Sequence, residues 1–163
     1  MNGALTMIKA PDPGLYRTTA SYPGLEQAIP AGVLVYVGAR DTGAPFVVRP
    51  GQNRRNRWFW GEPVTLLRSL SWGETLKRLP SEGFYTLPHD LEVAGGGRWL
   101  KNAIVQLGYN GEGRGILFVA EDHADETRNV LVFSDRGMLI DDDLLMRLQW
   151  ASILPVRAGS NAR

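Results

Sequence analysis

The chain has 163 residues, a length that suits one ordinary domain or two very small ones packed together. With 44% hydrophobic and 21% charged residues, it has enough apolar material for a core. It contains no cysteine, which excludes a disulfide framework and a thiolate metal site. No apolar run reaches the ~20 residues that a membrane span needs, and the N-terminus lacks the features of a secretory signal. We therefore expect a cytoplasmic protein without a membrane partner.

The net charge of +1 hides an uneven distribution. Residues 1–80 carry ten Lys or Arg and five Asp or Glu, a net charge of +5, whereas residues 81–163 carry eight and twelve, a net charge of −4. A basic half and an acidic half attract each other or face different partners. The nineteen glycines and ten prolines predict frequent turns, and so short strands rather than long helices.

In chain order, residues 1–13 are a lead-in and residues 14–18 a first strand. The run from Val33 to Val48 has an apolar stretch on each side of a turn at Asp41–Gly43, which predicts a β-hairpin. A polar loop is expected over 52–57. A short strand follows at 58–60, where period two places Trp58 and Trp60 on one face and Phe59 on the other. Leucines at nearly helical spacing predict a helix over 64–79.

The second half begins with a strand at Gly83 and continues with a second hairpin over 103–119. An acidic, polar tip is expected over 121–128. The run Asp141–Asp143 suits the start of a helix, which we place at about 144–150. Residues 156–163 are expected to form a disordered tail.

The two halves match each other at an offset of about 70 positions. Gly38 falls on Gly108 and Gly43 on Gly113, which predicts two repeats, 14–80 and 83–155, each with short strands and a closing helical turn. The expected fold is mostly β, with two tandem small subdomains of SH3-like-barrel shape. The comparison concerns size and pattern alone, because no sequence hallmark of SH3 domains is present. The alternative is one mixed β domain with coincidental patterning.

Trp72 and Trp150 occupy matching positions near the ends of the two repeats. They are candidates for a seam between the repeats, with ordinary core packing as the alternative for each.

The sequence offers no motif for catalysis. The two histidines, His89 and His123, lack the converging partners that a metal site requires, and the carboxylates near His123 suit a solvated tip. No G-x-S-x-G elbow is present, and no serine has a histidine nearby to activate it. We therefore expect no enzyme activity, no cofactor and no metal.

Recognition is the better hypothesis. Residues 54–60 combine three arginines with three aromatic rings, a composition found both at protein–protein hot spots and on platforms for unpaired bases. The near-neutral charge and the lack of a matching basic stretch in the second repeat favour a protein partner. The acidic tip suits a basic protein surface. A plain core role for Trp58 and Trp60 remains the alternative at that site.

We therefore predict a non-catalytic adaptor, inhibitor or immunity-type protein that binds another protein. Nucleic-acid binding through Arg54–Trp60, flanked by Arg40 and Arg49, is the first alternative, and an enzyme with an unrecognised site is the second. The predicted partner-binding residues are Arg49, Arg54, Arg55, Arg57, Trp58, Trp60, Glu121, Asp122, Asp125 and Glu126.

Overall fold

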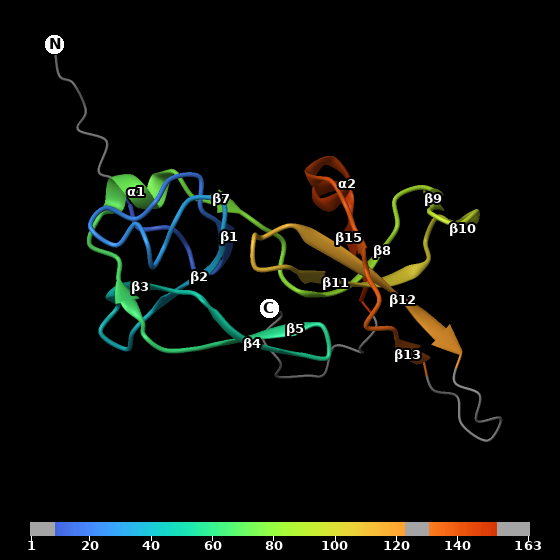
Figure 1. Cartoon of the computed structure of the whole chain (residues 1–163), viewed down its shortest axis with the longest axis horizontal. Coiled ribbons are helices and arrows are strands. Elements are labelled where there is room, and N and C mark those ends of the chain that lie inside the picture. The colour runs from blue at the N-terminus through green and yellow to red at the C-terminus, as the bar shows by residue number, and fades with distance from the viewer. Residues whose placement is uncertain (1–8, 123–130, 153–163) are drawn as a thin grey trace, which may run out of the picture.

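A computed structural model of the chain describes residues 9–122 and 131–152. The protein is mostly β, with short antiparallel strands and two short helices, as the sequence predicted. Figure 1 shows two lobes side by side, one for each half of the chain, with the β4–β5 hairpin extending from the first lobe toward the second. We call residues 9–80 the first half and residues 81–152 the second half.

The first half holds one five-stranded sheet, in the order β6-β3-β2-β1-β7, and a separate hairpin formed by β4 and β5. Its elements are β1 (Gly14–Arg17), β2 (Leu34–Ala39), β3 (Pro45–Val48), β4 (Pro50–Arg54), β5 (Arg57–Trp60), β6 (Thr65–Leu66), α1 (Leu70–Glu74) and β7 (Lys77–Arg78). The predicted hairpin over 33–48 is confirmed as the pair β2–β3.

The second half is built around a sheet in the order β13-β12-β11-β8-β15, in which β14 also pairs with β12. Its elements are β8 (Gly83–Thr86), β9 (Leu91–Val93), β10 (Gly97–Trp99), β11 (Ile104–Tyr109), β12 (Gly115–Asp122), β13 (Leu131–Phe133), β14 (Met138–Leu139), α2 (Asp142–Arg147) and β15 (Gln149–Trp150). The predicted hairpin over 103–119 is confirmed as β11–β12, and β9–β10 forms a further small hairpin.

The two sheets pair their strands in the same way. Strands β1, β2, β3, β6 and β7 correspond to β8, β11, β12, β14 and β15. The register agrees too, since Gly38 lies opposite Phe46 and Gly108 lies opposite Ile116. A tyrosine hydroxyl donates to a backbone oxygen four residues earlier in each half, Tyr16 in the first and Tyr85 in the second, both at 2.7 Å. The correspondence therefore extends from strand order to single hydrogen bonds.

The predicted helix over 64–79 is wrong. That segment forms β6, the five-residue helix α1 and β7 in succession. Its leucines do not share one face, because Leu67 belongs to the core of the first half while Leu79 packs into the core of the second. Helix α1 begins at the Ser69 cap, whose hydroxyl oxygen accepts from the backbone N–H of Trp72 at 3.3 Å.

The predicted polar loop over 52–57 is also wrong. Strands β4 and β5 run directly into each other through Arg55 and Asn56, which have φ angles of 52° and 66°. A two-residue turn with two positive φ angles matches the right-handed twist of a hairpin. The second predicted helix exists, but it runs from Asp142 to Arg147, and Gln149 and Trp150 form a strand.

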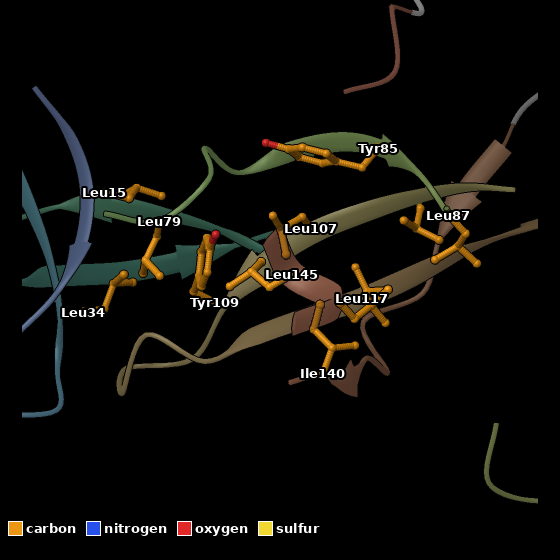
Figure 2. Close-up of a cluster of buried hydrophobic side chains, with 12 residues drawn as sticks. Leu15, Leu34, Leu79, Tyr85, Leu87, Leu107, Tyr109, Leu117, Ile140 and Leu145 are labelled. Carbon is orange, nitrogen blue, oxygen red and sulfur yellow. The ribbon is translucent and has the colours of Figure 1, made fainter. Parts of the chain in front are cut away.

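The buried side chains form two clusters. The first, with Tyr16, Val35 and Val37, lies wholly within the first half. The second contains the core of the second half together with Leu15, Leu34 and Leu79 from the first half. Figure 2 shows these three leucines beside Tyr109, at one end of the second cluster. The two halves therefore share a core along a seam.

Polar contacts reinforce the seam. The Arg17 guanidinium donates to both Asp142 carboxylate oxygens, at 2.8 and 2.9 Å, and to the Gly113 carbonyl at 2.8 and 3.2 Å. Lys77 contacts the same carboxylate at 2.6 Å, and the backbone N–H of Leu34 donates to Gly111 at 2.9 Å. The hydrogen bonds from Arg17 and Lys77 lower the pKa of Asp142. Because two cations share one carboxylate, this ionic contact is stronger than an isolated surface pair.

Neither of the predicted seam tryptophans lies in the seam. Trp72 is buried in the core of the first half, where its ring packs edge-on against Tyr22 at 4.8 Å, so the core-packing alternative holds for it. Trp150 is 60% exposed and touches Tyr85 edge-on at the outer side of strand β15. The seam instead uses Trp58 and Trp60, which pack against the shared core.

The seam yields a test with a built-in control. Leu34→Ala removes a fully buried side chain from the shared core, so we expect the free energy of unfolding to fall by about 3 kcal/mol. The equivalent residue of the second half is Ile104, which is 39% exposed, and Ile104→Ala should cost less than about 1 kcal/mol. Urea denaturation of both variants measures the difference, and equal losses would contradict the seam.

Candidate functional site

The β4–β5 hairpin has two unlike faces. On one face, the Trp58 indole N–H donates to the Tyr109 carbonyl at 2.7 Å, and the Trp60 ring stacks on Tyr36 at 5.5 Å. These two tryptophans are half-buried against the shared core. The structure therefore places them in the seam, as the core alternative for this stretch supposed.

The opposite face of the hairpin is exposed and basic. Phe59 is 53% exposed, and the Arg54 guanidinium lies over its ring, 5.7 Å from the centroid. Arg55 and Arg57 are exposed next to it. We call these four residues, Arg54, Arg55, Arg57 and Phe59, the basic hairpin face. It retains all three predicted arginines but one aromatic ring instead of three.

The two arginines expected to flank this stretch lie elsewhere. Arg49 is half-buried and donates to the Ala28 carbonyl at 3.1 Å, so it supports a loop of the first half. Arg40 lines a separate open hollow of about 660 Å³, together with Arg68 and Tyr22. The Tyr22 hydroxyl in that hollow is already engaged, since it donates to Leu66 and accepts from the Arg68 N–H. Neither flanking arginine therefore extends the basic hairpin face.

The acidic segment is described only in part. Glu121 and Asp122 continue strand β12 and pair with Val132 and Leu131, so the predicted tip starts later than position 121. Glu121 is exposed. Asp125, Glu126 and His123 fall outside the described residues.

Beside this strand lies a hollow that the sequence analysis did not predict. It has a volume of about 480 Å³ and is lined by Trp99, Ala103, Ile104, Val119, Ala120 and Leu131. Every lining residue is apolar or aromatic, and we call the hollow the apolar groove. Leu131, on the sheet's outermost strand, is 59% exposed. Soluble proteins seldom leave such clusters uncovered unless the surface binds something.

The first half shows what the groove corresponds to. Ile104 is equivalent to Leu34, which is fully buried by the second half. Arg17, the ionic anchor next to Leu34, is replaced by Thr86 next to Ile104. Among the described residues, the second half covers this face of the first sheet, whereas the equivalent face of the second sheet carries the apolar groove, next to the Asn56 contact with Gln106. The offset of about 70 positions between the two halves points to this site in the sequence, because it aligns Ile104 with the seam residue Leu34.

Across residues 9–122 and 131–152, no cluster of three or more His, Asp or Glu side chains is placed to hold a metal ion. The Nδ1 atom of His89 lies 2.8 Å from the backbone oxygen of Asp90, its own neighbour.

In the described part of the chain, no helix is long and apolar enough to cross a membrane.

One carboxyl group at the seam is electrostatically unusual. Glu82 accepts the backbone N–H of Trp58 at 3.2 Å and is half-buried. Burial raises the pKa of Glu82 to about 7, while the hydrogen bond from Trp58 and the charge of Arg57 act in the opposite direction. The group lies where the hairpin meets the second half, so its ionisation is coupled to the stability of the seam.

This coupling has a defined sign. The folded protein holds the Glu82 proton more tightly than the unfolded chain, whose pKa is near 4.5. The contribution of protonated Glu82 to the stability of the folded protein is therefore complete below pH 4.5 and is lost as the pH rises toward 7. We expect the free energy of unfolding of Glu82→Gln to exceed that of the wild type by about 1–2 kcal/mol at pH 8. The difference should vanish at pH 4.5. Denaturation at both pH values measures this, and a pH-independent difference would contradict it.

Comparisons with known protein families, curated proteins and solved structures found no match to this chain. The two halves of the chain, which share a strand order and register, therefore provide the comparison on which the functional argument rests.

Proposed function

We propose that this is a non-catalytic protein-binding protein, built from two tandem small barrel-like repeats over 14–80 and 83–155. The observation that carries the proposal is the apolar groove of the second half. Its equivalent in the first half is filled by protein, through the seam. A surface of the same topology that is apolar and that no residue in 9–122 or 131–152 fills is suited to a protein as well.

The chemistry of the groove indicates the kind of partner. Apolar and aromatic side chains at the centre of a patch are typical of protein–protein interfaces, where a few such residues supply most of the binding energy. The seam residues Arg17 and Lys77 correspond to Thr86 and Gln149 in the second half, so the cations that bind Asp142 have no counterpart there. Glu121 is exposed on strand β12 but does not line the groove. A partner that presents apolar side chains suits this surface.

Nucleic-acid binding is the second candidate. It is supported by Arg54, whose guanidinium lies over the exposed Phe59 ring. It is the weaker candidate because Trp58 and Trp60 pack in the seam and offer no stacking platform to a row of bases. A salt-sensitive shift of single-stranded nucleic acid that is lost in the triple variant of Arg54, Arg55 and Arg57 would favour it.

The groove can be tested with a matched pair of variants. Leu131→Asp places a charge in the groove, whereas Leu139→Asp places the same charge on an exposed leucine outside it, which is 49% exposed. In capture experiments with cross-linking, we expect Leu131→Asp to reduce recovery of the partner at least about tenfold. Leu139→Asp should leave recovery unchanged.

Lys101, which is exposed two residues before Ala103, is positioned to report the contact by cross-linking. Cross-links from Lys101 to the partner should disappear in Leu131→Asp. Equal recovery from the wild type and Leu131→Asp would contradict the proposed function.

A further inference from the structure

We propose that a hollow at the edge of the first sheet binds a small organic phosphate, with Arg40 and Arg68 on the phosphate group and apolar walls around the rest of the molecule. The hollow lies beside strand β6, where Tyr22, Leu66 and the two arginines are among its lining residues, and we call it the arginine hollow. Its volume of about 660 Å³ falls within the range of about 300–1,000 Å³ that is usual for small-molecule sites. The arginine hollow belongs to the first half and is separate from the apolar groove, so binding there is independent of the proposed function.

The framework of the hollow is held in place by the fold. The Tyr22 hydroxyl donates to the Leu66 carbonyl at 3.1 Å and accepts from the backbone N–H of Arg68 at 3.0 Å. These two bonds join the loop that carries Tyr22 to strand β6 and to the backbone of one arginine. The Tyr22 ring is buried and packs edge-on against Trp72 at 4.8 Å. A preorganised framework of this kind lowers the entropy cost of binding.

The hollow carries positive charge that the described part of the chain does not neutralise. The guanidinium groups of Arg40 and Arg68 line it, but no Asp or Glu of residues 9–122 and 131–152 does. The acidic residues nearest to the lining in sequence, Glu26, Asp41 and Glu62, are not part of the walls. Other arginines of the described chain form ion pairs with carboxylates, whereas these two do not. Because a guanidinium donates paired N–H bonds to phosphate oxygens, a phosphate suits this site.

The first arginine has an equivalent in the second half that serves a different purpose. The backbone N–H of Arg40 donates to Ala44 at 2.9 Å, and that of Asn110 donates to Arg114 at 3.1 Å, which makes the two turns equivalent. The side-chain oxygen of Asn110 accepts the backbone N–H groups of Glu112 and Arg114, at 3.1 and 2.9 Å, and so stabilises its own turn. The Arg40 side chain lines the hollow instead.

The second arginine also stands where the second half has a structural residue. The backbone N–H of Leu67 donates to the first residue of β3, and that of Ile140 donates to the first residue of β12, both at 3.0 Å. The residues that follow them, Arg68 and Asp141, are therefore equivalent. Asp141 caps helix α2 by accepting the backbone N–H of Leu144 at 2.8 Å. Helix α1 is capped by the residue after Arg68, so the guanidinium has no capping role and lines the hollow.

The walls indicate which phosphates fit. A phosphate monoester carries close to two negative charges at neutral pH, and so it matches two guanidinium groups. Leu25, Val64 and Leu66 give the rest of the hollow an apolar surface, which suits an apolar or aromatic body on the phosphate. Inorganic phosphate lacks such a body and phenol lacks the charge, so each should bind more weakly than phenyl phosphate, which has both.

The test titrates the purified 163-residue chain with phenyl phosphate and measures binding by calorimetry. We expect phenyl phosphate to bind at least about tenfold more tightly than inorganic phosphate or phenol, and high salt to weaken its binding. Arg40→Gln and Arg68→Gln should each weaken it at least about tenfold. The control Arg114→Gln changes an exposed arginine in the equivalent turn of the second half and should leave binding unchanged. All three arginines are exposed, so the variants are expected to fold, which their unfolding transitions check.

A phosphotyrosine tripeptide separates a small ligand from a modified protein. An affinity no more than about tenfold above that of phenyl phosphate supports the small ligand, and a higher affinity overturns it. A wild type that binds no phenyl phosphate at millimolar concentration would also overturn the inference, as would equal binding by Arg40→Gln and Arg114→Gln. Leu131→Asp, which changes the apolar groove, should retain binding, so the two proposals fail separately.

Discussion

The outer face of the first sheet is closed by the second half of the chain, and most of the structure depends on that contact. A sheet of short strands has two faces, and a half of this size has too little chain to cover both. Leu15 and Leu34 therefore pack into the core of the second half, while Tyr16 and Val35 on the other face pack into their own. The position of the β4–β5 hairpin follows, because its tryptophans lie along the same seam.

The equivalent faces of the two sheets carry different side chains. In the first half, Arg17 and Lys77 bind Asp142 across the seam, and the buried leucines fill the space between. In the second half, Thr86 and Gln149 stand in place of the two cations, and the apolar residues remain. This difference separates an internal contact from an apolar groove on the described surface of the second half.

The sequence predicted the parts of the fold that depend on local patterns. Alternation and turn glycines identified both central hairpins, and the acidic run predicted the second helix, which Asp141 caps by accepting from Leu144 at 2.8 Å. The hairpin turn at Arg55–Asn56 was missed because arginine rarely adopts a positive φ, so the turn carries no glycine signal. The segment 64–79 resembled one helix because its leucines serve two separate cores, which the spacing of residues does not reveal.

The candidate site was predictable to a smaller extent. The exposure of the three arginines followed from composition, and period two placed Phe59 on the face opposite Trp58 and Trp60, without indicating which face is exposed. The burial of Trp58 and Trp60 did not, because it depends on the second half packing against them. The groove is made by residues of four strands and the loop before β11, so it has no contiguous sequence signal.

The central claim is that the second half covers Leu34, whereas its equivalent Ile104 is 39% exposed in the part of the chain that the structure describes. Because the chain has no cysteine, single variants Leu34→Cys and Ile104→Cys each carry one thiol, whose rate of alkylation under native conditions reports its exposure. The account predicts that the thiol at position 104 reacts close to the rate of the unfolded chain, and that the thiol at position 34 reacts only through unfolding. Similar rates at the two positions in the folded protein would contradict it.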